Sequence, residues 1–195
     1  MRPAWRAMML ERLDRALTAL ERLASALAAV ALFLIMAIVA SDVALRYLFN
    51  RPWGWSYDFI SLYVMVALFF LALSRTFAVN GHISVDLLHH YLTPSTRRWC
   101  ELVICLLSAG LFALITQAGA IRAWQSYIDN DILAGVLAWP AWPSAALMPL
   151  GAGMITLRLA LSMVCHAYTL FTGREVILLP PIAGSAQAIE SGSFE

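Results

Sequence analysis

The sequence has no lysine and few charged residues of any kind. All 13 basic residues are arginine, charged residues make up 13% of the 195 residues, and the net charge is +1. Binding to nucleic acid usually requires a strongly basic surface, so we expect no nucleic-acid partner. Hydrophobic residues make up 62% of the chain, which is far above the share in a soluble domain. The composition therefore points to a membrane protein.

Cysteine is also scarce, and familiar catalytic patterns are missing. Cys100, Cys105 and Cys165 have no CxxC spacing, so we interpret them as small apolar side chains and not as a disulfide framework. The sequence contains no HExxH motif and no set of Ser, His and Asp at one membrane depth. We therefore expect neither catalysis nor a bound cofactor.

Long apolar stretches fill most of the chain. They predict membrane spans at about 23–45, 55–79, 100–121 and 142–166, since about 20 apolar residues are needed to cross a hydrocarbon core of about 30 Å. Such spans must be helical, because lipid offers no partners for backbone groups. We predict an all-α integral membrane protein with four transmembrane helices and short interfacial amphipathic helices. Small residues such as Ala109, Gly110, Gly151 and Gly153 are expected to permit close helix contact.

The flanking segments complete the predicted organisation. Residues 1–22 have apolar side chains at helical spacing with arginines and Glu21 between them, which is typical of an amphipathic helix at the cytoplasmic interface leading into span one. The transmembrane domain is predicted over 23–170. Residues 171–195 are rich in Pro, Gly, Ser and Ala, and we expect a cytoplasmic, largely disordered tail.

The distribution of arginine predicts the orientation. Positive residues concentrate on the cytoplasmic side of membrane proteins. Only Arg46, Arg51 and Arg122 fall on one side of the predicted spans, with Arg158 inside the fourth left out. The other side carries Arg2, Arg6, Arg12, Arg15, Arg22, Arg75, Arg97, Arg98 and Arg174. Both termini are therefore predicted to be cytoplasmic, and the first stretch is too long and lacks the cleavage site of a signal peptide.

The loop between spans one and two is rich in charged and aromatic residues. Asp42 and Arg46 are i, i+4 neighbours, and we predict an ion pair at the outer edge of span one. Charges beside a membrane core are costly and are usually retained for pairing or function. The candidates for structural or partner-interaction roles on this hairpin are Asp42, Arg46, Tyr47, Arg51, Trp55 and Asp58.

Three further candidates lie elsewhere. His82 and Asp86 belong to a segment whose apolar residues share one helical face, which predicts a second interfacial helix ending at Pro94, with Ser95 or Thr96 capping span three. His82, Asp86 and His90 could share a face, but Cys and Glu partners are missing, and no metal site is predicted. Arg158 is expected either to extend towards the inner membrane surface or to pair with Glu101.

The order of these features resembles the small permease subunit (DctQ-like) of tripartite ATP-independent periplasmic (TRAP) transporters. The resemblance covers roughly Leu10 to Cys165. The matching elements are Asp42-Val43, Arg46-Tyr47, Phe49-Asn50, Trp55 with Asp58, Gly81-His82-Ile83-Ser84-Val85-Asp86, and Pro140-Ala141-Trp142. Each element is short, and their order and spacing over four spans carry the resemblance.

The resemblance implies a function and a set of partners. In such transporters a soluble periplasmic protein captures an organic acid, and a large multi-span permease moves it inward by symport with sodium ions or protons. The small subunit holds the permease and helps to dock the binding protein. A location in the bacterial inner membrane, as a multi-pass protein in contact with the lipid bilayer, is implied as well. The residues fit this role, since Thr116 and Gln117 are the polar residues in mid-span, besides Arg158 near the cytoplasmic end.

Other classes of small four-span membrane protein remain as alternatives. A membrane cytochrome b would need paired axial histidines on facing helices, whereas the four histidines lie at or beyond the ends of the spans. A small membrane enzyme would need polar groups gathered at one depth. An independent exporter coupled to protons would favour an acidic residue in mid-span, and none is present.

Overall fold

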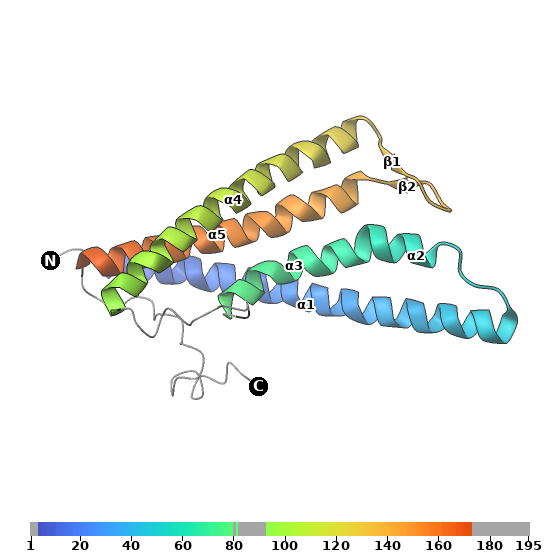
Figure 1. Cartoon of the computed structure of the whole chain (residues 1–195), viewed down its shortest axis with the longest axis horizontal. Coiled ribbons are helices and arrows are strands. Elements are labelled where there is room, and N and C mark those ends of the chain that lie inside the picture. Colours follow the sequence, from blue (N-terminus) through green and yellow to red (C-terminus); the bar gives the residue numbers. More distant parts are fainter. Residues whose placement is uncertain (1–3, 80, 82–92, 173–195) are drawn as a thin grey trace.

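A computed structural model describes residues 4–79, 81 and 93–172, and Figure 1 shows the arrangement of the elements. The helices are α1 (Ala4–Phe49), α2 (Ser56–Phe59), α3 (Met65–Ala78), α4 (Pro94–Ile128) and α5 (Trp142–Thr172). A π-helical turn, η1 (Ile60–Val64), joins α2 to α3. Strands β1 (Ile132–Leu133) and β2 (Trp139–Pro140) form an antiparallel hairpin between α4 and α5, with Ile132 opposite Pro140 and Leu133 opposite Trp139.

Four helical segments of the described chain are long and apolar enough to cross a membrane: 12–49, 56–78, 96–128 and 142–170. The predicted fold class, an all-α membrane protein with four spans, is therefore confirmed. The sequence analysis did not predict the π-helical turn or the β1–β2 hairpin. The tail from 173 onwards and the segment 82–92, with the predicted second interfacial helix, lie outside the described residues.

Three helices end later than the predicted spans, since α1 ends at Phe49, α4 at Ile128 and α5 at Thr172. Helix α1 is one continuous element of 46 residues, and its sequence contains no Gly or Pro to interrupt it. Helix α4 begins earlier than expected. Thr93 is its N-cap and accepts the N–H of Thr96 at 3.4 Å, with Pro94 in the first turn. The cap is therefore not Ser95 or Thr96.

Over most of their length the spans lie side by side in an open layer, in the order α1, α3, α5, α4, and the N-terminal part of α1 passes behind α5 (Figure 1). Helix α3 packs between α1 and α5, and α5 packs between α3 and α4. A closed four-helix bundle would bury one stripe of every helix. Here the contiguous core is small: Cys105, Ile155 and Leu159 are buried, and partly buried side chains from α3, α4 and α5 surround them.

Small residues let the central helices approach closely. A Cβ atom on Gly151 of α5 would lie 2.2 Å from the carbonyl oxygen of Phe70 in α3. Gly119 of α4 faces Met148 and Pro149 of α5, where a Cβ atom would meet Pro149 Cδ at 3.1 Å. Gly110 was also expected at a close contact, but no atom lies within 4 Å of its Cβ position, so that expectation was wrong.

The contact between α3 and α5, which we call the α3–α5 seam, also involves the π-helical turn. A π turn leaves carbonyl groups out of the regular i→i−4 pattern. The hydroxyl of Ser144 in α5 donates to the carbonyl oxygen of Leu62 at 2.5 Å. This bond joins the start of α5 to the π-helical turn that precedes α3.

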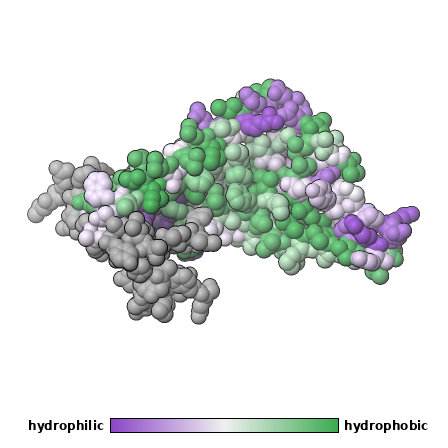
Figure 2. Space-filling view, in the orientation of Figure 1, coloured by the Kyte–Doolittle hydropathy of each residue, from purple (hydrophilic) through white to green (hydrophobic). Residues whose placement is uncertain are grey.

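Apolar side chains cover most of the helical surface, and Figure 2 shows hydrophilic residues gathered where α4 meets β1 and at the loop between α1 and α2. We call the end of the layer that carries this loop and the β1–β2 hairpin the hairpin end. Helix α4 leaves large side chains such as Leu107, Leu111 and Leu114 exposed. In water this surface would be unfavourable, so it faces lipid or other membrane helices.

Candidate functional site

Asp42 joins the end of span one to the following loop. Its Oδ2 atom pairs with Arg46 Nη2 at 3.1 Å, and its Oδ1 atom accepts the backbone N–H of Trp53 at 2.6 Å. The Asp42 side chain is 13% exposed and that of Arg46 is 61% exposed. The i, i+4 pair lies where the sequence placed it, whereas the bond to Trp53 was missed, because it depends on how the chain turns at Asn50 (φ 51°).

Asp58 performs a similar task for the second hairpin. Its Oδ2 atom accepts the backbone N–H of Val136 at 2.8 Å, across 78 residues of sequence. Gly135 lies beside it, and a Cβ atom there would lie 2.5 Å from the same oxygen, so a larger residue would displace the Asp58 carboxylate. Asp58 thus fastens the β1–β2 hairpin to α2. The sequence singled out Asp58 but gave no partner for it.

Aromatic rings connect the same two segments. Trp53 stacks on Trp55 with centroids 5.3 Å apart, Trp55 meets Phe59 at 5.9 Å, and Phe59 lies 5.7 Å from Trp139 of β2. Tyr63 contacts Trp139 at 5.6 Å and donates its hydroxyl to the Pro140 carbonyl. Each aromatic pair contributes about 0.5–1.5 kcal/mol beyond area burial. The hairpin end is therefore held by side chains as well as by the two carboxylates.

The charged side chains of the hairpin end differ in exposure and in their bonding partners. The carboxylates of Asp42 and Asp58 are engaged by backbone N–H groups of the chain itself. Arg51 is exposed and most of the Arg46 side chain is exposed. Tyr47 is also exposed, on the last turn of α1. Arg46 and Asp42 balance each other, and Asp58 keeps its negative charge opposite the exposed Arg51, so the charges of these four candidates cancel.

Arg158 contacts α1 at the opposite end of the layer. Its Nη1 atom lies 2.7 Å from Asp14 Oδ1, and its Nε atom lies 3.9 Å from Glu21 Oε1. Glu21 Oε1 also accepts the hydroxyl of Ser74 in α3 at 2.7 Å. The partners of Arg158 are thus on α1. The sequence analysis had suggested either a pair with Glu101 or extension of the side chain towards the inner membrane surface. This cluster links α1, α3 and α5.

Glu21 is the residue of this cluster that the sequence analysis misinterpreted. It was placed with the arginines on the polar side of an interfacial helix, but both Glu21 and Ser74 are 0% exposed. One signal was available, since Asp14 and Glu21 are seven residues apart and therefore lie on the same helical face. A buried carboxylate needs partners: Arg158 and Ser74 engage Oε1, whereas the buried Oε2 atom has no hydrogen-bond partner among the described residues.

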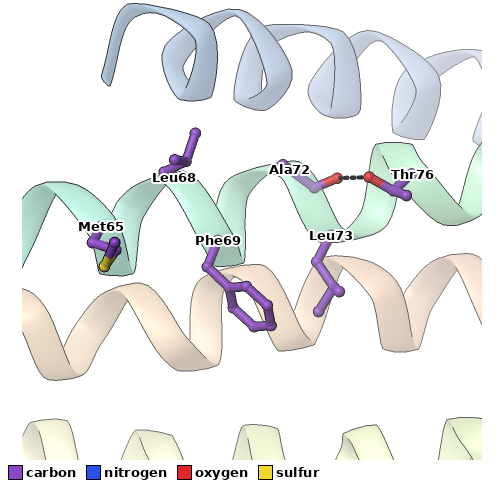
Figure 3. Close-up of a pocket in the computed structure, with 6 residues that line it drawn as sticks. All are labelled: Met65, Leu68, Phe69, Ala72, Leu73 and Thr76. Atoms are coloured by element: carbon purple, nitrogen blue, oxygen red, sulfur yellow. Dashed lines mark hydrogen bonds between the residues drawn. The ribbon is translucent and has the colours of Figure 1, made fainter. Parts of the chain in front are cut away.

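A shallow apolar hollow runs along the face of α3. Its volume is about 390 Å³, and it is lined by Met65, Leu68, Phe69, Ala72, Leu73 and Thr76. In Figure 3, Leu68 points towards α1, whereas Phe69 and Leu73 extend over α5. The Thr76 hydroxyl is satisfied by the Ala72 carbonyl at 2.9 Å. The hollow therefore suits an apolar neighbour better than a charged ligand.

His82 and Asp86 lie outside the described residues, as does the candidate metal triad with His90. Among the residues that the structure describes, no group of three or more His, Cys, Asp and Glu side chains is placed to hold a metal ion.

The two bonds of Asp42 lead to unequal effects of substitution. Arg46→Ala should lower the free energy of unfolding by only about 0–1 kcal/mol, because an exposed pair is weak. Asp42→Ala should cost about 1–3 kcal/mol, since the Trp53 N–H loses its acceptor. Asp42→Asn keeps an oxygen for that N–H and should retain most of the stability. Thermal unfolding of the purified variants measures all three, and equal losses for Arg46→Ala and Asp42→Ala would contradict the assignment.

The comparisons with known proteins give one match. The family model described as "Tripartite ATP-independent periplasmic transporters, DctQ component" matches residues 35–169. This range covers more than half of the chain and includes Asp42, Asp58 and Arg158. No match was found among curated proteins or among solved structures. The family match agrees with the four apolar helices, and the chain belongs to the DctQ family of tripartite ATP-independent periplasmic transporters.

Proposed function

We propose that this chain is the small membrane subunit that scaffolds a large multi-span permease and helps to seat a periplasmic binding protein, during uptake of an organic acid driven by an ion gradient. The observation that supports it best is the open layer of helices. A single layer leaves two broad apolar faces for contact with another membrane protein, whereas a closed bundle would cover one of them.

The bonding partners of the polar groups inside the layer favour a structural role over a transport path. Several hydroxyl groups in the spans bond to carbonyl groups of their own helix, as Thr116 does to Phe112 and Thr156 does to Ala152, both at 2.7 Å. Others join two elements, as Ser74 does with Glu21 and Ser144 does with Leu62. Arg158 is engaged by Asp14 and Glu21. A path for an anionic substrate would require broken helices or polar groups that turn towards it near the membrane midplane.

Two features of the layer favour packing against a membrane partner. In lipid the hydrophobic effect is absent, and helices associate through van der Waals contact between surfaces of matching shape. The hollow along α3 offers a concave surface for such contact, with the small residue Ala72 between larger side chains. The uncovered side of α4 adds a second apolar surface. We infer that the permease covers part of this area in the assembled transporter.

The arginine distribution supports an orientation with both termini in the cytoplasm of a bacterial inner membrane. In a variant without native cysteines, Asn50→Cys should react with an impermeant thiol reagent in intact cells, and Ser185→Cys should react only after the cells are opened. The hairpin end would then face the periplasm. Labelling of Ser185→Cys alone in intact cells would reverse this orientation.

Reconstitution tests the function directly. The chain alone, the permease alone, and both together with the binding protein are placed in proteoliposomes under an ion gradient. Uptake of an organic acid should appear only with the complete set, because this chain provides no polar path and the permease lacks its support. Uptake by the chain alone, or undiminished uptake in its absence, would show that the scaffold proposal is wrong.

A further inference from the structure

The apolar hollow along α3 has the length of one leaflet of a membrane. It extends from Met65 to Thr76, and at about 1.5 Å per helical residue this corresponds to about 16 Å. One leaflet contributes about 15 Å of hydrocarbon, half of a core of about 30 Å. The membrane-crossing segment that carries the hollow covers residues 56–78, so Met65 lies near its middle and Thr76 near its end. The hollow therefore occupies a single leaflet, the one opposite the hairpin end.

The shape of the hollow favours a lipid chain over a neighbouring helix. Leu68 points towards α1, whereas Phe69 and Leu73 extend over α5 (Figure 3). The small side chain of Ala72 leaves open space between them. A transmembrane helix must cross the whole hydrocarbon core, so a surface shaped for it would continue through both leaflets. A hollow confined to one leaflet matches a lipid, whose chains reach only to the membrane centre.

Arg75 lies at the end of the hollow that is nearest to the membrane surface. It is in the last turn of α3, next to Thr76, and it follows Leu68 by seven residues, so the two side chains share a helical face. Helix α3 contains no acidic residue. Among the residues that the structure describes, no ion pair or hydrogen bond involves the Arg75 guanidinium. Since charges beside the membrane core are usually retained for pairing or function, Arg75 calls for an anion.

Positive charge predominates at this end of the layer. The basic residues described there are Arg12, Arg15, Arg22, Arg75, Arg97, Arg98 and Arg158, and the acidic ones are Glu11, Asp14, Glu21 and Glu101. Two of these acids, Asp14 and Glu21, are engaged by Arg158. Basic groups on the cytoplasmic side of membrane proteins bind the anionic headgroups of lipids. An anion joined to an apolar chain, which is an anionic phospholipid, therefore fits both Arg75 and the hollow.

We propose that the hollow along α3 holds one acyl chain of an anionic phospholipid, whose phosphate pairs with Arg75. In the orientation given above, this lipid belongs to the cytoplasmic leaflet, whose surface is the negative one. The lipid fills the space over Ala72, and a permease on this side contacts it together with the edges of the hollow. The inference rests on the proposed orientation and goes beyond the proposed transport role.

Native mass spectrometry of the full chain tests the headgroup. The chain is released from nanodiscs that contain equal amounts of phosphatidylglycerol and phosphatidylcholine with the same acyl chains. One phosphatidylglycerol should stay bound with at least a fivefold preference, and Arg75→Gln should remove this preference because it removes the charge. Arg51→Gln is the matched control, since Arg51 is an exposed arginine of the opposite end, and the preference should be unchanged. Equal retention of the two lipids, or a preference that survives Arg75→Gln, would overturn the proposal.

The chain site is tested by filling the hollow. Ala72→Leu places a larger side chain in the open space and should reduce retention of phosphatidylglycerol at least fivefold. Ala29→Leu makes the same change at an exposed position of α1 and should have no effect. Unchanged retention in Ala72→Leu would contradict the assignment of the hollow. Displacement of the lipid by millimolar inorganic phosphate would also contradict it, because the site would then recognise free phosphate without a chain.

The same measurement on the complete membrane complex separates a lipid from a permease helix as the occupant. Phosphatidylglycerol should remain bound after assembly with the permease, with the same dependence on Arg75. Release of the lipid on assembly would mean that the permease fills the hollow, and the proposal would be wrong. Either result, with uptake that still requires the subunit, leaves the proposed function standing; undiminished uptake without the subunit would refute that function instead.

Discussion

Gly151→Ala is expected to disrupt the seam between α3 and α5. The added methyl group would lie 2.2 Å from the Phe70 carbonyl oxygen and 2.7 Å from the Phe70 carbonyl carbon. Both are backbone atoms of a helix, so relief requires that the helices move apart and not that one side chain rotates. Overpacking typically costs about 1–3 kcal/mol, and we expect the upper part of this range. The loss would be seen as a lower midpoint of thermal unfolding.

Gly110→Ala provides the control for this experiment. No atom lies within 4 Å of the Gly110 Cβ position, so the same chemical change adds no contact there. Alanine also favours the helix over glycine by about 1 kcal/mol. Gly110→Ala should therefore be neutral or stabilising. If Gly151→Ala unfolds at the same temperature as Gly110→Ala, the close approach of α3 and α5 is not present in the membrane-embedded protein.

Removing the Arg158 guanidinium should have a much larger effect than removing an exposed arginine. Arg158→Met leaves Glu21 buried with Ser74 but without its cationic neighbour. Loss of one member of a buried ion pair costs about 3–5 kcal/mol, because the remaining charge is uncompensated. Combining Arg158→Met with Glu21→Gln removes that charge and should recover part of the loss. Unfolding of the four proteins of this cycle measures the coupling.

Arg122→Met is the comparison for the buried arginine. Arg122 pairs with Asp131 at 3.5 Å, and the two side chains are 67% and 37% exposed. Such a pair is worth about 0–1 kcal/mol. Similar losses at Arg122 and Arg158, or the absence of any recovery in the double variant, would mean that Glu21 is not held by Arg158.

The sequence was informative wherever a property belonged to one segment. The four spans followed from apolar runs of sufficient length, and the Asp42–Arg46 pair followed from i, i+4 spacing. The continuity of α1 agrees with the absence of Gly and Pro in residues 4–49. The Thr93 cap could have been recognised, because it directly precedes Pro94.

The contacts between distant segments could not be predicted in this way. In lipid a helix is apolar on all sides, so no hydrophobic stripe indicates which helix lies beside it. The order of the layer therefore had no signature in the sequence. The same holds for the partner of Asp58, since an N–H group such as that of Val136 is present at almost every position. Glu21 was misinterpreted because a charged residue is normally expected on the polar face of an interfacial helix.

The order α1, α3, α5, α4 also has a consequence for biogenesis. Each outer pair consists of spans that follow one another along the chain, so α1 with α3, and α4 with α5, can leave the insertion machinery as two helical hairpins. The α3–α5 seam, with Gly151 against Phe70, must then form between them. So must the contact of Arg158 in α5 with Asp14 and Glu21 in α1. Synthesis of the two halves as separate polypeptides should accordingly suffice for assembly, and these two contacts would be the step at which they recognise each other.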